Sequence, residues 1–168
     1  MSWRAIVTAA SAALALALAG CATGTTNGFE IDVPAGWADR TSEAEVKAGR
    51  KEFELVLAPE RDDSDTPPIM TVSRAELREG DTLEDVVRVQ RKDAEAANPS
   101  APQTMTLAGE PAQGYDFAAE GRTGRTIVAI RGGRTYALSL VADEEDFARV
   151  RPAMESVATS WRWEAEDG

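Results

Sequence analysis

Residues 126–130, Thr-Ile-Val-Ala-Ile, constrain the fold more than any other stretch, because apolar side chains occupy successive positions there. Successive side chains of a β-strand point to opposite faces of the sheet. A run that is apolar on both faces is therefore typical of a central strand that is covered on both sides. We expect a sheet with other elements packed on each face, and we expect Val128 and Ile130 to be buried.

Turn residues on either side of this strand predict an antiparallel meander. Gly121–Gly124 separates the strand from an upstream segment in which apolar residues alternate with polar ones. Gly132 and Gly133 fit a two-residue hairpin turn. The predicted strands span residues 113–120, 125–131 and 134–142.

The N-terminal half predicts further strands. Phe29–Val33 alternates apolar and acidic residues, which is typical of a half-buried strand, and Pro34–Trp37 supplies a turn after it. Lys51–Leu57 and Ile69–Ser73 form a predicted hairpin with a long acidic tip. Asp62, Asp63 and Asp65 lie in that tip; they either coordinate calcium or form a solvated loop.

Two helices are predicted. Thr82–Asp85 has the form of a capping box, and an apolar stripe at helical spacing follows it until Asn98-Pro99. Asp143 is expected to cap a last helix, within which Pro152 should cause a kink or a split into two pieces. The fold class is therefore α+β: an antiparallel sheet of about six strands flanked by helices.

The N-terminus predicts export and anchoring. An apolar segment, Ala5–Ala19, follows Arg4 and ends at Gly20-Cys21, as in a secretory signal peptide. It is shorter than the roughly 20 apolar residues that span a bilayer. Leu-Ala-Gly-Cys resembles the lipobox of bacterial lipoproteins, which implies cleavage between Gly20 and Cys21 and a diacylglyceryl group on Cys21. The alternative is an ordinary signal peptide cut elsewhere, which leaves Cys21 as a free thiol.

These patterns divide the chain into four parts. Residues 1–20 are the predicted signal peptide, 21–28 the lipidated cysteine with a flexible tether, 29–163 the α+β domain, and 164–168 a frayed acidic tail. A tether of this length reaches at most about 25 Å. The folded domain is therefore expected close to the membrane, on its extracytoplasmic side.

Composition limits the chemistry of the domain. The formal charge of −11 argues against nucleic-acid binding. The sequence has no histidine and one cysteine, which argues against Ser-His-Asp catalysis, thiol-histidine catalysis and imidazole-ligated zinc. We therefore expect no catalytic residue, no metal and no cofactor. A hydrolase built on two carboxylates is the remote alternative.

Two sets of residues are candidate contacts for a ligand or partner. Four arginines decorate the predicted meander: Arg122, Arg125, Arg131 and Arg134. They either receive an anionic group or pair with nearby carboxylates. Trp37, Trp161 and Trp163 either line a groove or anchor the rim of the sheet. We take Trp37 and Trp163 as the candidate contacts among them.

The order of elements resembles the PsbP-like fold. The likeness rests on the start Phe29–Trp37, on the meander and on the ending Ser156–Trp161. Together with the lipobox, the chain resembles actinobacterial surface lipoproteins of the LpqN/LpqT type. That resemblance implies a PsbP-like α/β/α sandwich and a role in the cell envelope.

Two functions then compete. The first is a non-catalytic, membrane-anchored module that docks another cell-envelope protein, acting as a monomer. The second is a carrier that holds a lipid or small ligand between sheet and helix. A carrier needs an apolar cavity of a few hundred Å³, whereas a docking module has a filled core, so the structure discriminates between them.

Lipidation makes a testable prediction. Expressed in its host, a Cys21→Ala variant should leave the membrane fraction, because it lacks the thiol that carries the acyl chains. Detergent partitioning and the mass of the mature N-terminal peptide measure this. An unchanged distribution and peptide mass would contradict lipidation at Cys21.

Overall fold

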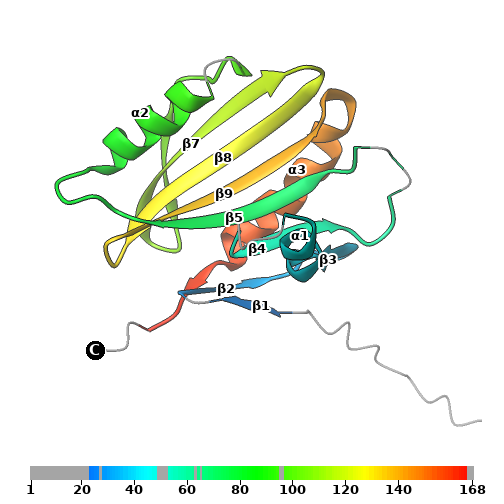
Figure 1. The fold of residues 1–168 in the computed structure, drawn as a ribbon, viewed down its shortest axis with the longest axis horizontal. Helices are drawn as coiled ribbons and strands as arrows, with labels where there is room; N and C mark the ends of the chain where they lie inside the picture. The colour runs from blue at the N-terminus through cyan, green and yellow to red at the C-terminus, as the bar shows by residue number, and fades with distance from the viewer. Residues whose placement is uncertain are drawn as a thin grey trace, which may run out of the picture.

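The computed structural model describes residues 23–26, 28–48, 53–62, 64, 66–94 and 97–165 (Figure 1). The predicted signal peptide, Cys21 and its cleavage site lie outside these residues. The elements run in the order β1 (Thr23–Thr26), β2 (Phe29–Asp32), β3 (Trp37–Asp39), α1 (Thr41–Ala48), β4 (Leu55–Pro59), β5 (Ile69–Glu76), α2 (Leu83–Asp93), β6 (Gln103–Leu107), β7 (Glu110–Ala119), β8 (Arg122–Arg131), β9 (Arg134–Asp143), α3 (Glu144–Ser160) and β10 (Arg162–Trp163).

A seven-stranded sheet forms the body of the domain, in the order β3-β4-β5-β9-β8-β7-β6. All of its neighbouring strands pair antiparallel. The predicted meander is confirmed as β7, β8 and β9, and the predicted hairpin as β4 and β5. The fold class is therefore the predicted α+β sheet flanked by helices.

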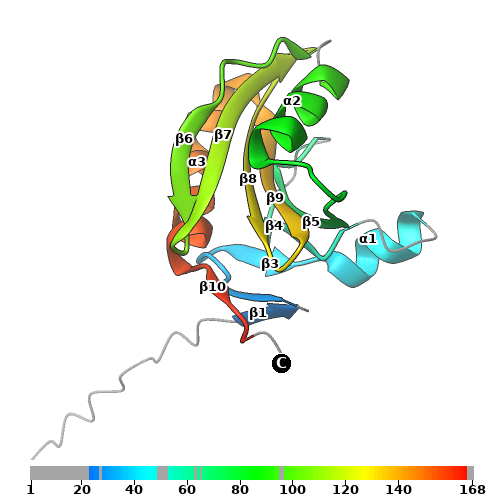
Figure 2. The same ribbon diagram turned by 90° about the vertical axis from the view of Figure 1, so that its left-hand side faces the viewer.

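Helices cover both faces of this sheet, with α2 on one side and α3 on the other (Figure 2). The alternation along β8 explains why two layers are needed. Ile127 and Ala129 belong to the larger core cluster, which includes Val150 and Met154 of α3. Val128 points to the other face, where it packs in a second cluster with Val87 of α2. Both faces of one strand are thus buried by different helices.

Of the two residues of β8 that we expected to be buried, Val128 and Ile130, one is buried. Val128 is 0% exposed. Ile130 is only half-buried, which corrects the prediction that it is fully covered. Ile130 is the last residue before Arg131 at the end of β8, and on this face the cluster under α2 includes Val128 but not Ile130.

Helix α2 begins with the predicted capping box. The Thr82 hydroxyl accepts a hydrogen bond from the Asp85 amide at 3.2 Å, and the Asp85 carboxylate accepts one from the Thr82 amide at 3.0 Å. The bonds from Thr82, joined by one from Arg88, lower the pKa of Asp85 to about 2. The cap therefore stays ionised over the whole physiological range.

Helix α3 differs from its prediction in two ways. It is one continuous element across Pro152, because Pro152 and Ala148, whose carbonyl loses its i+4 donor, are both exposed to water. Asp143 occupies the N-cap position without a side-chain capping bond. Its carboxylate instead accepts a hydrogen bond from Thr66 at 2.9 Å.

A second sheet has three strands in the order β1-β2-β10 (Figure 1). It pairs the N-terminal strands with the C-terminal strand. Strand β1 pairs with β2 from Thr23↔Asp32 to Thr26↔Phe29. This differs from the flexible tether predicted for residues 21–28. The backbone of residues 23–26 follows the edge of β2, so the small polar residues there act as a strand.

The burial of β8 generates a stability prediction. Val128→Asp should abolish cooperative folding, because an unpaired buried carboxylate costs several kcal/mol against a total stability of about 5–15 kcal/mol. Ile130→Asp, the matched control in the half-buried position, should lower stability by about 1–3 kcal/mol. Thermal and urea unfolding measure both. Equal effects of the two substitutions would contradict this placement of the core.

Candidate binding groove between strand β6 and helix α3

An open groove of about 460 Å³ lies between the edge of the large sheet and helix α3. Strand β6 and its turn form one wall, β8 contributes to the floor, and α3 forms the other wall. Its lining residues are Met105, Thr106, Ala108, Arg125, Ile127, Arg151, Met154, Glu155, Ala158 and Thr159. The groove therefore combines an apolar floor with two guanidinium groups.

Gly114 on β7 explains why residues of β8 reach this groove. Gly114 pairs with Gln103 of β6 and with Ile127 of β8. A Cβ atom at Gly114 would lie 3.0 Å from the sulfur of Met105 and 3.2 Å from Nη2 of Arg125. The missing side chain thus provides the space in which the Arg125 guanidinium lies across β7.

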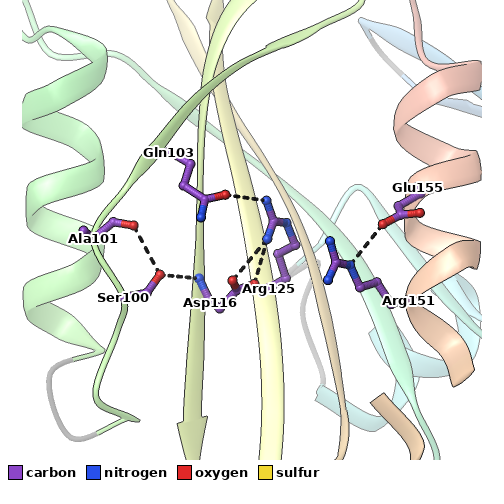
Figure 3. A network of polar contacts seen from close by, with 7 residues as sticks. All are labelled: Ser100, Ala101, Gln103, Asp116, Arg125, Arg151 and Glu155. Carbon is purple, nitrogen blue, oxygen red and sulfur yellow. Dashed lines mark hydrogen bonds and ion pairs between the residues drawn. The ribbon is translucent and has the colours of Figure 1, made fainter. Parts of the chain in front are cut away.

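Arg125 is held in place by polar contacts from two strands (Figure 3). Its Nη1 donates to both carboxylate oxygens of Asp116, at 2.9 and 3.2 Å, and its Nη2 lies 3.5 Å from Oε1 of Gln103. Asp116 is itself fixed, because its amide donates to the Ser100 hydroxyl at 3.0 Å. With a side chain only 13% exposed, Arg125 is a built part of the groove wall.

Arg151 faces Arg125 from helix α3 (Figure 3). Its Nε donates to Glu155 one turn along the helix, at 3.0 Å. Its two terminal nitrogens have no bonding partner among the residues that the structure describes. The groove is therefore close to neutral overall, but it offers guanidinium N–H donors to an incoming acceptor.

The other candidate arginines do not share this site. Arg122 lies at the opposite end of β8 from Arg131, about 30 Å away at 3.3 Å per residue. It forms an ion pair with Asp143 at 3.5 Å beside a second, acidic hollow of about 640 Å³. That hollow is lined by Thr66, Glu120, Gly121, Arg122, Asp143, Glu144 and Glu145.

Arg131 and Arg134 lie beside the β8–β9 turn, and each pairs with a carboxylate. Arg131 donates to Glu110 at 2.9 Å and stacks over Trp163 at 5.5 Å from the ring centroid. Arg134 donates to Glu76 at 3.1 Å. The four candidate arginines are thus spread along the sheet, each with a carboxylate partner, and only Arg125 lies in the groove.

Trp161 and Trp163 lie together where the small sheet joins the body, with 5.3 Å between their ring centroids. Trp161 is 3% exposed and stacks on Phe29 at 4.3 Å between ring centroids. Trp163 is half-buried, lies 5.0 Å from Tyr136, and donates from Nε1 to the Leu107 carbonyl at 3.3 Å. Trp37 is 8% exposed at the start of β3. None of the three lines the groove.

Sequence reasoning missed the α3 side of the groove. Arg151, Glu155 and Thr159 repeat at helical spacing and share one helix face, but nothing in the sequence indicates that this face borders β6. Gly114 carried the one usable signal, since an isolated glycine within a strand marks a close approach.

The acidic tip of the β4–β5 hairpin, for which calcium binding and a solvated loop are the two alternatives, is described only in part. Asp62 accepts a hydrogen bond from the Ser64 amide at 2.9 Å, and bonding from Ser64 lowers the pKa of Asp62; Asp63 and Asp65 lie outside the described residues. Within the described ranges, no acidic or cysteine cluster could hold a metal ion. No described helix is long and apolar enough to cross a membrane.

Comparisons with known proteins bear on the fold and family. A family model described as the serine/threonine kinase C-terminal domain matches residues 23–163. The structure is similar to LpqN, described as involved in cell envelope biogenesis of Mycobacterium tuberculosis, with a TM-score of 0.61, 15% identity, and coverage of 82% of this chain and 83% of that chain. No curated protein matches the sequence.

A second similar structure is the PsbP of the cyanobacterium Synechocystis sp. PCC 6803. The TM-score is 0.58 at 16% identity, covering 82% of this chain and 87% of that chain. At these identities the likeness concerns the fold alone. The PsbP-like architecture expected from the sequence is confirmed.

The Arg125 network generates a prediction about stability. Asp116→Asn should lower the free energy of unfolding by about 1–2 kcal/mol, because a hydrogen-bonded charge pair with a largely buried partner is broken. Glu155→Gln, which breaks the exposed pair with Arg151, should cost only about 0.3–0.5 kcal/mol. Urea unfolding of both variants checks the difference. A larger effect at Glu155 would show that Arg151, and not Arg125, is the held group.

Proposed function

The chain belongs to the family of serine/threonine kinase C-terminal domains, and from this premise we propose that it is a non-catalytic binding module that docks another cell-envelope protein. The family description names a domain attached to an enzyme and not the catalytic unit itself. The open β6–α3 groove is the observation that carries the proposal.

The fold supports a place in the envelope. The similar LpqN structure is described as that of a protein involved in cell envelope biogenesis. The signal-peptide pattern and the lipobox at Cys21 agree with such a location. Because the fold alone does not define a role, the groove and the anchor carry the rest of the proposal.

The anchor sets how the domain is held. Thr23, the first residue of β1, follows Cys21 by two residues, a span of at most about 7 Å. A lipid on Cys21 therefore holds the β1-β2-β10 end against the outer surface of the membrane. Confinement to this thin layer raises the effective concentration of any membrane protein, so that a weak contact suffices.

The charge distribution in the groove supports binding over catalysis. A carboxylate-based hydrolase needs two carboxyl groups that converge on the reacting bond. Asp116 and Glu155, the two acids of the groove region, are each engaged by an arginine. They serve to hold guanidinium groups in position.

A carrier of a small amphiphilic anion is the second candidate, favoured by the groove itself. Its volume of about 460 Å³ falls in the range of small-ligand sites, and Arg125 and Arg151 could receive an anionic head. Against this stands the filled core: side chains such as Leu138, Leu140 and Met154 between sheet and α3 are at most 1% exposed. The groove is open at the surface and has no enclosed apolar chamber.

Crosslinking from the membrane-bound protein tests the docking proposal. We expect a reproducible membrane-protein partner, recovered less as salt is added, because the chain carries a net charge of −11 and favours a partner with a basic face. The Cys21→Ala variant should lose the crosslink. Recovery of no partner, together with a lipid released on denaturing the purified protein, would favour the carrier.

A further inference from the structure

We propose that strand β6 accepts an extended segment of the docked protein as an added strand, with one apolar and one acidic side chain of that segment in the β6–α3 groove. This inference rests on the proposed function and names how docking occurs. Strand addition supplies affinity through main-chain hydrogen bonds, and pockets for alternate side chains supply specificity.

The first support is the free edge of β6. This strand is the last of the seven-stranded sheet. The β6–β7 hairpin closes through Ala108 and Gly109, so Leu107↔Glu110 is its hydrogen-bonded closing pair. Pairs alternate along an antiparallel ladder, which directs the N–H and C=O groups of Thr104 and Thr106 away from β7. Both residues are exposed, and no described residue outside β7 forms a hydrogen bond with these outward groups.

The second support is the lack of features that usually protect an edge. Natural edge strands carry charges, prolines or bulges that prevent pairing. Gln-Thr-Met-Thr-Leu, the sequence of β6, has no charged residue and no proline. At the opposite edge, β3 spans three residues and ends at Asp39, whose carboxylate accepts hydrogen bonds from Thr41. The two edges are thus built differently.

The third support is the chemistry next to the edge. Trp163 contacts the Leu107 carbonyl and Arg125 contacts Gln103, so β6 runs from the arginine end of the groove toward the C-terminal end of α3. Met105 and Ala158, which are half-buried, supply apolar surface along this path, above the buried Ile127 and Met154. Arg151 stands at the arginine end.

This arrangement defines the chemistry of the incoming segment. Alternate residues of a strand point to the same face about 6.6–7 Å apart. An apolar side chain on the groove face then lies beside Met105, a β6 side chain that lines the groove. A carboxylate two residues away reaches Arg151, whose terminal nitrogens are not used by any described residue. A basic side chain at the same position would face two guanidinium groups.

A polypeptide fits the edge better than a hydrocarbon chain. Covering the outward N–H and C=O groups of Thr104 and Thr106 with acyl chain would remove water from them without replacing its hydrogen bonds. Another backbone replaces those bonds. The observations therefore favour an extended peptide, and a lipid becomes an outcome of the test.

Peptide binding to the purified full-length chain in detergent tests the proposal. The probe is a fluorescent peptide, Lys-Thr-Asp-Thr-Leu-Thr-Lys, with a control in which Lys replaces Asp. We expect Thr106→Pro to reduce affinity at least tenfold, because it removes an outward donor and leaves the β6–β7 ladder intact. Thr106→Val, the matched control, keeps that N–H and should bind as the unmodified protein does.

Arg151→Gln tests the acidic position. It should reduce the preference for the Asp peptide over the Lys peptide roughly three- to fivefold, the range expected of a partly exposed ion pair. Unchanged circular dichroism and melting temperature show that each variant is folded. Binding of neither peptide at millimolar concentration, or equal binding by Thr106→Pro and Thr106→Val, would overturn strand addition at β6.

A photoreactive residue at Thr104 separates this inference from the proposed function. Crosslinks from Thr104 to a membrane protein support both. A partner that crosslinks to the protein but not from Thr104 overturns the β6 site and leaves docking intact. Saturable binding of oleate that Thr106→Pro does not affect, without peptide binding, assigns the groove to an anionic lipid and overturns the inference.

Discussion

The burial of β8 on both faces is the constraint on which the rest of the structure depends. Side chains at alternate positions of this strand enter two separate apolar clusters, and neither cluster can form without a helix over it. Helices α2 and α3 are therefore obligatory. The position of α3 in turn determines one wall of the groove. Helix α3 packs on β8, β9 and β2. Its residues Arg151, Glu155 and Thr159 therefore line the groove opposite β6, the edge strand of the sheet.

The sequence contained most of the fold and little of the site. The strands around Ile127 and the capping box at Thr82 follow from local periodicity and hydrogen bonding, so they could be predicted. Strand β1 could not, because Thr23–Thr26 has no apolar alternation and is ordered by pairing with β2. The continuity of α3 across Pro152 also depended on exposure, which only the packed structure defines.

The candidate arginines show that the functional site, too, could be predicted only in part from the sequence. Arg122, Arg125, Arg131 and Arg134 have similar sequence settings, and each has a carboxylate partner. What distinguishes Arg125 is the absence of a side chain at Gly114 on the neighbouring strand and the presence of Arg151 opposite. Both features depend on contacts between residues that are distant in the sequence. No local sequence pattern indicates such contacts.

The small sheet has a consequence for how such a domain can be used. Strands β1 and β10 flank β2, with Thr23 opposite Asp32 and Trp163 opposite Phe29. Both ends of the described domain thus belong to the small sheet, while the groove lies between β6 and α3. A domain whose first and last strands belong to one small sheet can be joined to another chain there without altering the groove.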